Sequence, residues 1–256
     1  MMGGKVIHAP IKEPKKILDV GCGTGVVTEL LASKFPKAQV FGLDLSKVPE
    51  LRDRPSNVKF LQGNILDQAP DVWVPSGSLD KSGGLDLIFS RLLVCGMNDW
   101  PSYPKNAFSL LSSGGYMEIH DVDWVWFDSS GTEISADWAW WQRVRAAGES
   151  RGLNFLCASK AATWMRDAGF VDIQVSKYRW PFGGRWEKTE DMRGMGDYSA
   201  EAMPEMVHHM IPKSMEGQNL SSEEIEEMRK AMKKDLAPEE GKHWDFYVTV
   251  GRKPCR

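Results

Sequence analysis

The sequence predicts an α/β protein built on a doubly wound parallel sheet. Apolar runs with strand character alternate with helical segments through the first half of the chain. A glycine-rich turn, Asp19–Gly25, follows the first apolar run, and an acid, Asp44, ends the second. Strands that alternate with helices form parallel sheets covered on both faces. With 256 residues, of which 42% are hydrophobic, the chain suits one large α/β domain with insertions.

The elements of the first half follow from short apolar runs between turn signals. The nearly continuous apolar run Leu85–Phe89 is typical of a strand covered on both faces. Strands are expected at 17–20, 39–43, 57–61, 85–89 and 116–120, with helices at 26–32 and 103–111.

The regular alternation of short strands and helices ends after residue 121. Helices are expected at 134–150 and 160–168, and strands at 170–178 and 244–250. Ser221 and Glu224 form a capping box that predicts a further helix, with Ile225, Met228 and Met232 on one face. Residues 180–220 are rich in Met, Gly and Pro without a period, which predicts an irregular lid.

These elements predict a core interrupted by a helical and irregular cap. The expected segments are a cofactor-binding core at 1–127, a cap insertion at 128–159, a core helix and strand at 160–179, a lid insertion at 180–242, and the final core strand at 243–256.

The glycine turn predicts a nucleoside-cofactor site. Glycines at 21, 23 and 25 allow left-handed backbone angles and close approach of a ligand. Asp44, at the tip of the second strand, is placed to accept both hydroxyls of a ribose. A dinucleotide site would place a third glycine where Val26 stands, which disfavours a nicotinamide cofactor. The alternative without a ligand is a tight structural turn.

Composition and motif spacing limit the kinds of partner, compartment and metal site that the chain is expected to have. The formal net charge is −3 and no basic stripe is present, so a nucleic-acid partner is not expected. No apolar run reaches membrane-spanning length, and the N-terminal residues lack the basic-then-apolar pattern of a signal peptide, so no membrane partner is expected. The cysteines (22, 95, 157 and 255) show no paired spacing, which predicts reduced thiols in a cytoplasmic or nuclear protein. His208–His209 lacks ligand partners at metal spacing, so no metal site is expected.

The pattern Asp-x-Gly-x-Gly-x-Gly resembles the first motif of class I S-adenosylmethionine (SAM) methyltransferases. With further segments, the chain from about residue 8 to its end resembles the fungal LaeA-like (TAM-domain) methyltransferases. The segments are His8–Ile11, Gly42–Ser46, Asp86–Arg91, Asn98–Trp100, Gly114–Asp121 and Val250–Pro254.

The resemblance implies a seven-stranded sheet with its last strand antiparallel and SAM across its carboxyl edge. Position by position, it implies that the turn residues Asp19, Gly21, Cys22, Gly23 and Gly25 hold the methionine part. It implies that Asp44 takes the ribose and that Leu45, Asn64 and Ile65 contact the adenine. It places Ser90 and Arg91 near the sulfonium; a structural salt bridge is the alternative for Arg91.

The chain departs from the family pattern at three points. Asn64 stands where Asp is common, and His120 where Gln is usual. Family members carry an N-terminal helical segment that closes over the cofactor, whereas this chain starts almost at the first strand. The pocket is therefore expected to be open, closed by the 180–220 segment, or completed by a second copy or another protein.

Methyl transfer from a sulfonium is an in-line displacement that needs alignment and water exclusion more than acid–base chemistry. His120 is the candidate base for a neutral acceptor, and Asp121 and Asp123 are candidates to orient it. The alternatives are a structural hydrogen-bonded histidine and acids that cap a loop or helix. The expected substrate pocket is apolar, with core packing as the alternative for its aromatic rings. Its candidate residues are Cys95, Trp124, Trp126, Trp138 and Trp141.

The sequence thus predicts a SAM-dependent enzyme that O-methylates a small apolar secondary metabolite. Two alternatives are a SAM-binding regulator that acts through protein partners and a methyltransferase scaffold recruited for another reaction, such as a cyclisation. Fold does not determine function, so the step from site to substrate follows from the resemblance.

Overall fold

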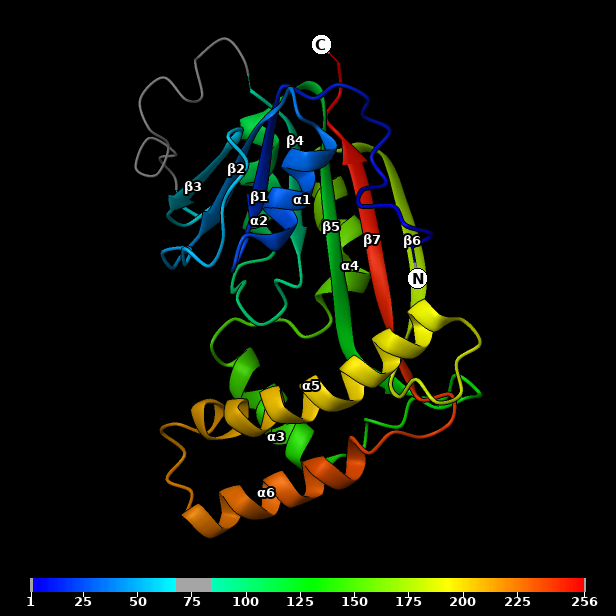
Figure 1. The fold of residues 1–256 in the computed structure, drawn as a ribbon. Coiled ribbons are helices and arrows are strands. Elements are labelled where there is room, and N and C mark those ends of the chain that lie inside the picture. Colours follow the sequence, from blue (N-terminus) through cyan, green and yellow to red (C-terminus); the bar gives the residue numbers. More distant parts are fainter. Residues whose placement is uncertain (1, 68–83, 256) are drawn as a thin grey trace. The chain divides into compact units, whose positions relative to one another are not determined.

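In the part of the chain that the computed structural model describes, residues 2–67 and 84–255, seven strands form one sheet of order β3-β2-β1-β4-β5-β7-β6 (Figure 1). The sheet is mixed, with its last strand antiparallel, as predicted. The strands are β1 (Lys16–Val20), β2 (Gln39–Asp44), β3 (Val58–Gln62), β4 (Leu85–Arg91), β5 (Leu111–Phe127), β6 (Val171–Pro181) and β7 (His243–Arg252).

The register brings the carboxyl ends of three strands together. β1 pairs in parallel with β2 on one side and β4 on the other, so Val20 lies beside both Leu43 and Ser90. All three residues are buried. The chain direction of the crossovers reverses on either side of β1, and ligands of open α/β sheets bind at such a reversal, outside the carboxyl ends. The fold therefore places the glycine turn and Asp44 where a cofactor site is expected.

The chain divides into two units, each described here by itself. The sheet unit comprises residues 2–121, 157–176 and 247–255, and the cap unit comprises 122–156 and 177–246. Strands β5, β6 and β7 each contribute residues to both units. The segment boundaries predicted from the sequence stay a prediction, and residues 68–83 of the expected core lie outside the described residues.

Three helices belong to the sheet unit: α1 (Val26–Lys34), α2 (Ser102–Leu110) and α4 (Cys157–Asp167). α1 packs on β2 and β3 on one face of the sheet, whereas α2 and α4 contact each other on the opposite face (Figure 1). Coverage on both faces explains why β1 and β4 are buried almost throughout.

The cap unit carries three helices that pack on one another: α3 (Ala139–Glu149), α5 (Glu190–Ser214) and α6 (Ser222–Asp235). The predicted capping box is present at the start of α6, where Ser221 and Glu224 bond each other's backbone N–H groups. Met228 and Met232 are buried on the apolar face of this helix, as its periodicity predicted.

The prediction of an irregular lid at 180–220 is wrong for most of that segment. A single helix of 25 residues, α5, spans Glu190–Ser214 and includes Pro204 and Pro212. The Thr189 hydroxyl accepts a hydrogen bond from the Met192 N–H and caps its start. Packing against α3 and α6 supplies stability that local propensity does not, because most helical stability in proteins comes from tertiary contacts.

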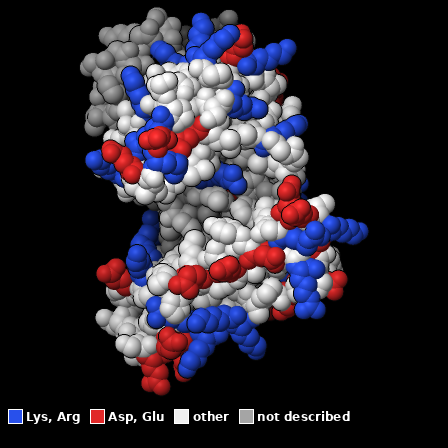
Figure 2. Space-filling model, in the orientation of Figure 1, with Lys and Arg blue, Asp and Glu red and all other residues white. Residues whose placement is uncertain are grey.

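Acidic and basic side chains are interspersed on the face drawn in Figure 2. No helix in the described part of the chain combines the length and the apolar character needed to cross a membrane.

Candidate active site

The glycine turn between β1 and α1 has the left-handed geometry that its sequence predicts. Gly21, Gly23 and Gly25 have φ values of 67°, 54° and 81°. A Cβ atom at Gly21 would lie 2.1 Å from Leu93 Cδ2, and one at Gly25 would lie 2.4 Å from Phe60 Cζ. A side chain would therefore be both strained and obstructed at these positions.

Asp44, at the end of β2, is hydrogen-bonded to the glycine turn. Its Oδ2 accepts a hydrogen bond from the Gly23 N–H at 2.9 Å, and its Oδ1 accepts one from the Ser46 N–H at 2.9 Å. The backbone of the turn is tied to the same strand, because the N–H groups of Gly21 and Cys22 both donate to the Leu43 carbonyl. The predicted ribose acceptor and the predicted methionine-binding turn thus form one connected structure.

A cavity of about 250 Å³ lies at this edge of the sheet. It is lined by five of the predicted cofactor residues, namely Gly21, Asp44, Leu45, Asn64 and Ile65. Leu45 is 61% exposed and is therefore accessible to an aromatic ring of a ligand, whereas Ile65 is buried. The Asn64 side-chain oxygen accepts the Leu66 N–H at 3.0 Å and keeps a second lone pair for a ligand.

A loop that directly follows β4 forms the opposite wall of this cavity, which the sequence did not indicate. Leu92, Leu93, Gly96, Met97 and Asn98 line it. Leu92 has a φ of 56° and is 44% exposed, which is an unusual combination for a leucine. Strained residues of this kind occur at ligand sites, where surrounding structure holds them.

Asp19 is buried below the turn. Its Oδ2 accepts a hydrogen bond from the Thr28 hydroxyl at 2.6 Å. The pKa of this carboxyl is raised to about 7, chiefly by burial and also by the nearby Asp44 charge, while the Thr28 bond and the Arg91 charge act in the opposite direction. A carboxyl that is only partly ionised at neutral pH lies where the resemblance places the methionine part of SAM.

Ser90 and Arg91 end β4 beside Asp19. Ser90 is fully buried, close to the buried phenol of Tyr103 on α2. Burial lowers the pKa of Arg91, while the Asp19 charge raises it. The thiol of Cys22, within the turn, has its pKa raised to about 12 by burial and by the charges of Asp19 and Asp44, so it is not a thiolate.

His120 and Asp121 are buried at the point where β5 leaves the sheet unit. The His120 ring is 2.5 Å from Glu118 Oε1, and burial lowers its pKa, which favours the neutral ring that a general base requires. Asp121 accepts the Leu93 N–H at 2.8 Å and thereby holds the loop that lines the cavity. Their catalytic roles stay a prediction.

The predicted pocket residues fall into different units. Cys95 belongs to the sheet unit and is exposed as a residue, but atoms packed around its thiol desolvate it and, with the Asp121 charge, raise the pKa of the thiol to about 12. The tryptophans belong to the cap unit, where Trp124 stacks on Trp141 at 5.3 Å and Trp126 lies 5.2 Å from Trp138. Trp124, Trp126 and Trp141 are at most 2% exposed, so they form the packed core of that unit. Their role in a substrate pocket stays a prediction.

The site lies at the switch point of the sheet. It consists of a strand, a left-handed glycine turn, a helix, and an acid at the tip of the next strand. This arrangement defines a nucleoside-cofactor-binding α/β protein. Residues 5–175 match the family model described as a methyltransferase domain. The chain belongs to this family, which confirms the predicted class and SAM as its cofactor.

Relatives and solved structures agree with this family. The chain is 30% identical over 124 residues to the methyltransferase str2 of Strobilurus tenacellus, covering 48% of this chain and 42% of that protein. It is 31% identical over 134 residues to the secondary metabolism regulator laeA of Coprinopsis cinerea, covering 50% and 31%. The matches therefore span less than half of these relatives, and they confirm the LaeA-like resemblance.

The fold is similar to that of Haemonchus contortus phosphoethanolamine N-methyltransferase 2, solved in complex with S-adenosyl-L-methionine. The TM-score is 0.53 at 18% identity, covering 96% of this chain and 50% of that one. At this identity the likeness supports the fold alone.

Proposed function

We propose that this protein transfers the methyl group of SAM, in line, to an oxygen atom of a small apolar secondary metabolite. The observation that carries the proposal is the connection of Asp44 to the glycine turn at the mouth of the cavity. The groups predicted to bind ribose, adenine and methionine lie along one edge of the sheet, which supports a fixed place for the sulfonium. Fixed alignment is the main protein contribution to this reaction.

The half-buried Arg91 supports an oxygen acceptor. A guanidinium stays charged in proteins and binds carboxylates through two parallel hydrogen bonds. An ionised carboxylate or phenolate beside it could accept a methyl group without a general base. A neutral alcohol would need one, and His120 is the predicted group for that case. The fungal relatives, named for methyl transfer and for secondary metabolism, support a small secondary metabolite as the substrate.

The cofactor site is tested by calorimetric titration with SAM and with S-adenosylhomocysteine. Asp44→Ala should weaken binding of both by about 10-fold to 100-fold, because hydrogen bonds to a charged group contribute about 1.5–3 kcal/mol. Asp53→Ala is the matched control, because Asp53 is exposed and close in sequence. Equal affinities in wild type and Asp44→Ala would contradict the proposed ribose contact.

The acceptor is tested by measuring S-adenosylhomocysteine formation with a panel of apolar carboxylic acids, phenols and alcohols. Turnover of acids and phenols by wild type, retained in His120→Gln, would show that no base at 120 is needed. Turnover restricted to amines or to carbon acceptors would contradict O-methylation.

A second candidate is a SAM-binding regulator that works through protein partners. The similarity to the Coprinopsis laeA regulator favours it. This function predicts SAM binding without turnover on any small molecule, together with a stable complex with one defined protein that Asp44→Ala weakens. Turnover of a small molecule at an ordinary enzymatic rate would remove this candidate.

A further inference from the structure

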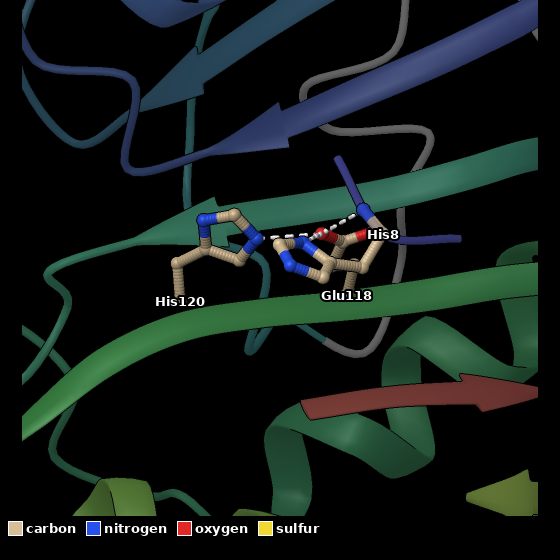
Figure 3. A group of neighbouring side chains, drawn as sticks. All are labelled: His8, Glu118 and His120. Atoms are coloured by element: carbon tan, nitrogen blue, oxygen red, sulfur yellow. Dashed lines mark hydrogen bonds and ion pairs between the residues drawn. The ribbon is translucent and has the colours of Figure 1, made fainter. Parts of the chain in front are cut away.

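Glu118 occupies an unusual place in the sheet unit. It is fully buried on β5 and lies between His120, two residues further along the same strand, and His8, which is 110 positions earlier in the sequence (Figure 3). His120 Nε2 is 2.5 Å from Glu118 Oε1, and His8 Nδ1 is 3.6 Å from the same oxygen. The three donor atoms all lie within 4.8 Å of one another.

We propose that His8, Glu118 and His120 together bind one divalent transition-metal ion, for which Zn²⁺ is the best match. Two imidazoles and a carboxylate form a ligand set that suits zinc and leaves a fourth position open. Metal–ligand distances near 2.1 Å require neighbouring donor atoms about 3.4 Å apart in a tetrahedral site. The separation of 3.6 Å already fits, and the 2.5 Å pair needs to open by less than about 1 Å.

The charge of the cluster favours a cation. A buried carboxylate is costly unless it is paired or coordinates a metal. Glu118 forms ion pairs with both histidines, and a neutral imidazole brings no charge. A metal ion held between the three side chains would supply a positive charge in direct contact with the carboxylate. Neutral imidazoles are also the form that binds a metal.

Surrounding groups hold the three side chains in place. The Glu118 carboxylate accepts hydrogen bonds from the backbone N–H groups of His8 and Ala9. Glu118 Oε1 is 2.7 Å from the backbone nitrogen of His8, and Oε2 is 2.8 Å from the backbone nitrogen of Ala9. The Phe89 ring packs edge-on against the His120 ring at 4.7 Å. Such supporting contacts orient metal ligands and are needed for tight binding. The His8 side chain is 13% exposed, which gives the ion a path from solvent.

The proposal changes the interpretation of His120. A histidine whose Nε2 binds a metal cannot accept a proton at that atom, so His120 would serve as a ligand rather than as the catalytic base. His120 pairs with Arg91 across the β4–β5 ladder, which places the metal one strand from the predicted sulfonium end of the cofactor site. The ion would fix the segment around His8 to β5 beside this site.

The test is a titration of the chelator-treated protein with Zn²⁺ alone, in competition with a chromophoric chelator. One ion should bind per wild-type chain, and Co²⁺ should give the visible absorption of a tetrahedral centre. His8→Ala and His120→Gln should each weaken binding by more than about 100-fold. His209→Ala is the control, because His209 is exposed on α5 and pairs with Glu205 outside the cluster; it should bind as wild type does.

His8→Ala decides the question if the His120 variant fails to fold, since it keeps the backbone N–H that Glu118 accepts. Absence of one-to-one binding at micromolar Zn²⁺ would overturn the proposal and leave a proton-sharing cluster that anchors residues 8 and 9. Binding that is unchanged in His8→Ala, or lost in His209→Ala, would overturn it equally. Because the readout is metal content, failure of the proposed methyl transfer would not affect the outcome.

Discussion

Asp19 is the residue whose ionisation the fold alters most clearly at the cofactor site. Its pKa rises from 3.8 to about 7, chiefly because burial disfavours the carboxylate. Between these values the folded chain keeps a proton that the unfolded chain has released. The free energy of unfolding should therefore fall as pH rises from about 4 to about 7, with the full loss present above pH 7.

Asp19→Asn should remove this contribution. The amide oxygen can still accept the Thr28 hydroxyl, so the variant should be as stable as wild type near pH 4 and more stable above pH 7. Denaturant unfolding at several pH values measures the free energy of unfolding of wild type and Asp19→Asn and checks this prediction. The same slope in both proteins would show that another group causes the pH dependence.

Binding of a cation beside Asp19 should release its proton. SAM should therefore bind more tightly as pH rises through about 7, and S-adenosylhomocysteine, which lacks the sulfonium charge, should show a weaker dependence. Calorimetry at pH 6 in two buffers of different ionisation enthalpy measures the protons released. Equal proton release with both ligands would place the sulfonium away from Asp19.

Sequence reasoning at the residue scale located the parts of the site that lie next to a motif. The glycine turn, Asp44, Leu45, Asn64 and Ile65 are adjacent to strand ends that periodicity reveals. Leu92 and Met97 were missed, because their position depends on the Asp121 bond to the Leu93 N–H, a contact between residues 28 positions apart. His8 and Glu118 are 110 positions apart, and spacing rules for metal ligands cover only local pairs.

At the scale of elements, α5 offers two glycines with opposite expected effects. A Cβ atom at Gly196 would lie 2.6 Å from the Gly183 carbonyl oxygen, whereas one at Gly194 meets nothing within 4 Å. Gly196→Ala should destabilise the protein by about 1–3 kcal/mol through overpacking. Gly194→Ala should stabilise it by about 0.5–1 kcal/mol, because alanine favours the helix.

Denaturant unfolding of both variants measures these changes. Since the substitution is the same and the helix is the same, the difference isolates the close approach of α5 to Gly183. Equal effects of the two substitutions would contradict that approach.

Elements with a regular pattern were predicted well, and elements held by packing were not. The strands near 17, 39, 58 and 85 and the capped helix at 222 have local signals, and they are present. α5 carries two prolines and two glycines, which local rules assign to loops, and its packing on α3 and α6 outweighs them. β5 extends to Leu111–Phe127, beyond the predicted 116–120, because Ser112–Gly115 are residues typical of turns and Asp121 and Asp123 interrupt the apolar run.

At the scale of the whole molecule, cofactor binding should raise the stability of the fold. A ligand that binds only the folded chain stabilises it by about 2.7 kcal/mol at a hundred times its Kd. SAM and S-adenosylhomocysteine should both raise the thermal unfolding midpoint in wild type and in Asp53→Ala. In Asp44→Ala the same ligand concentration should give a smaller rise. A rise of equal size in all three proteins would show that the ligands bind elsewhere.

The way the chain passes between its two units limits how the protein can be rebuilt. The boundaries fall after residues 121, 156, 176 and 246, and three of these lie inside β5, β6 and β7 rather than in loops. A cap taken from another protein would therefore have to be joined in the middle of three hydrogen-bonded strands, with side-chain alternation continued across every junction. New specificity is more accessible by substitution within the existing cap than by exchange of the cap as a module.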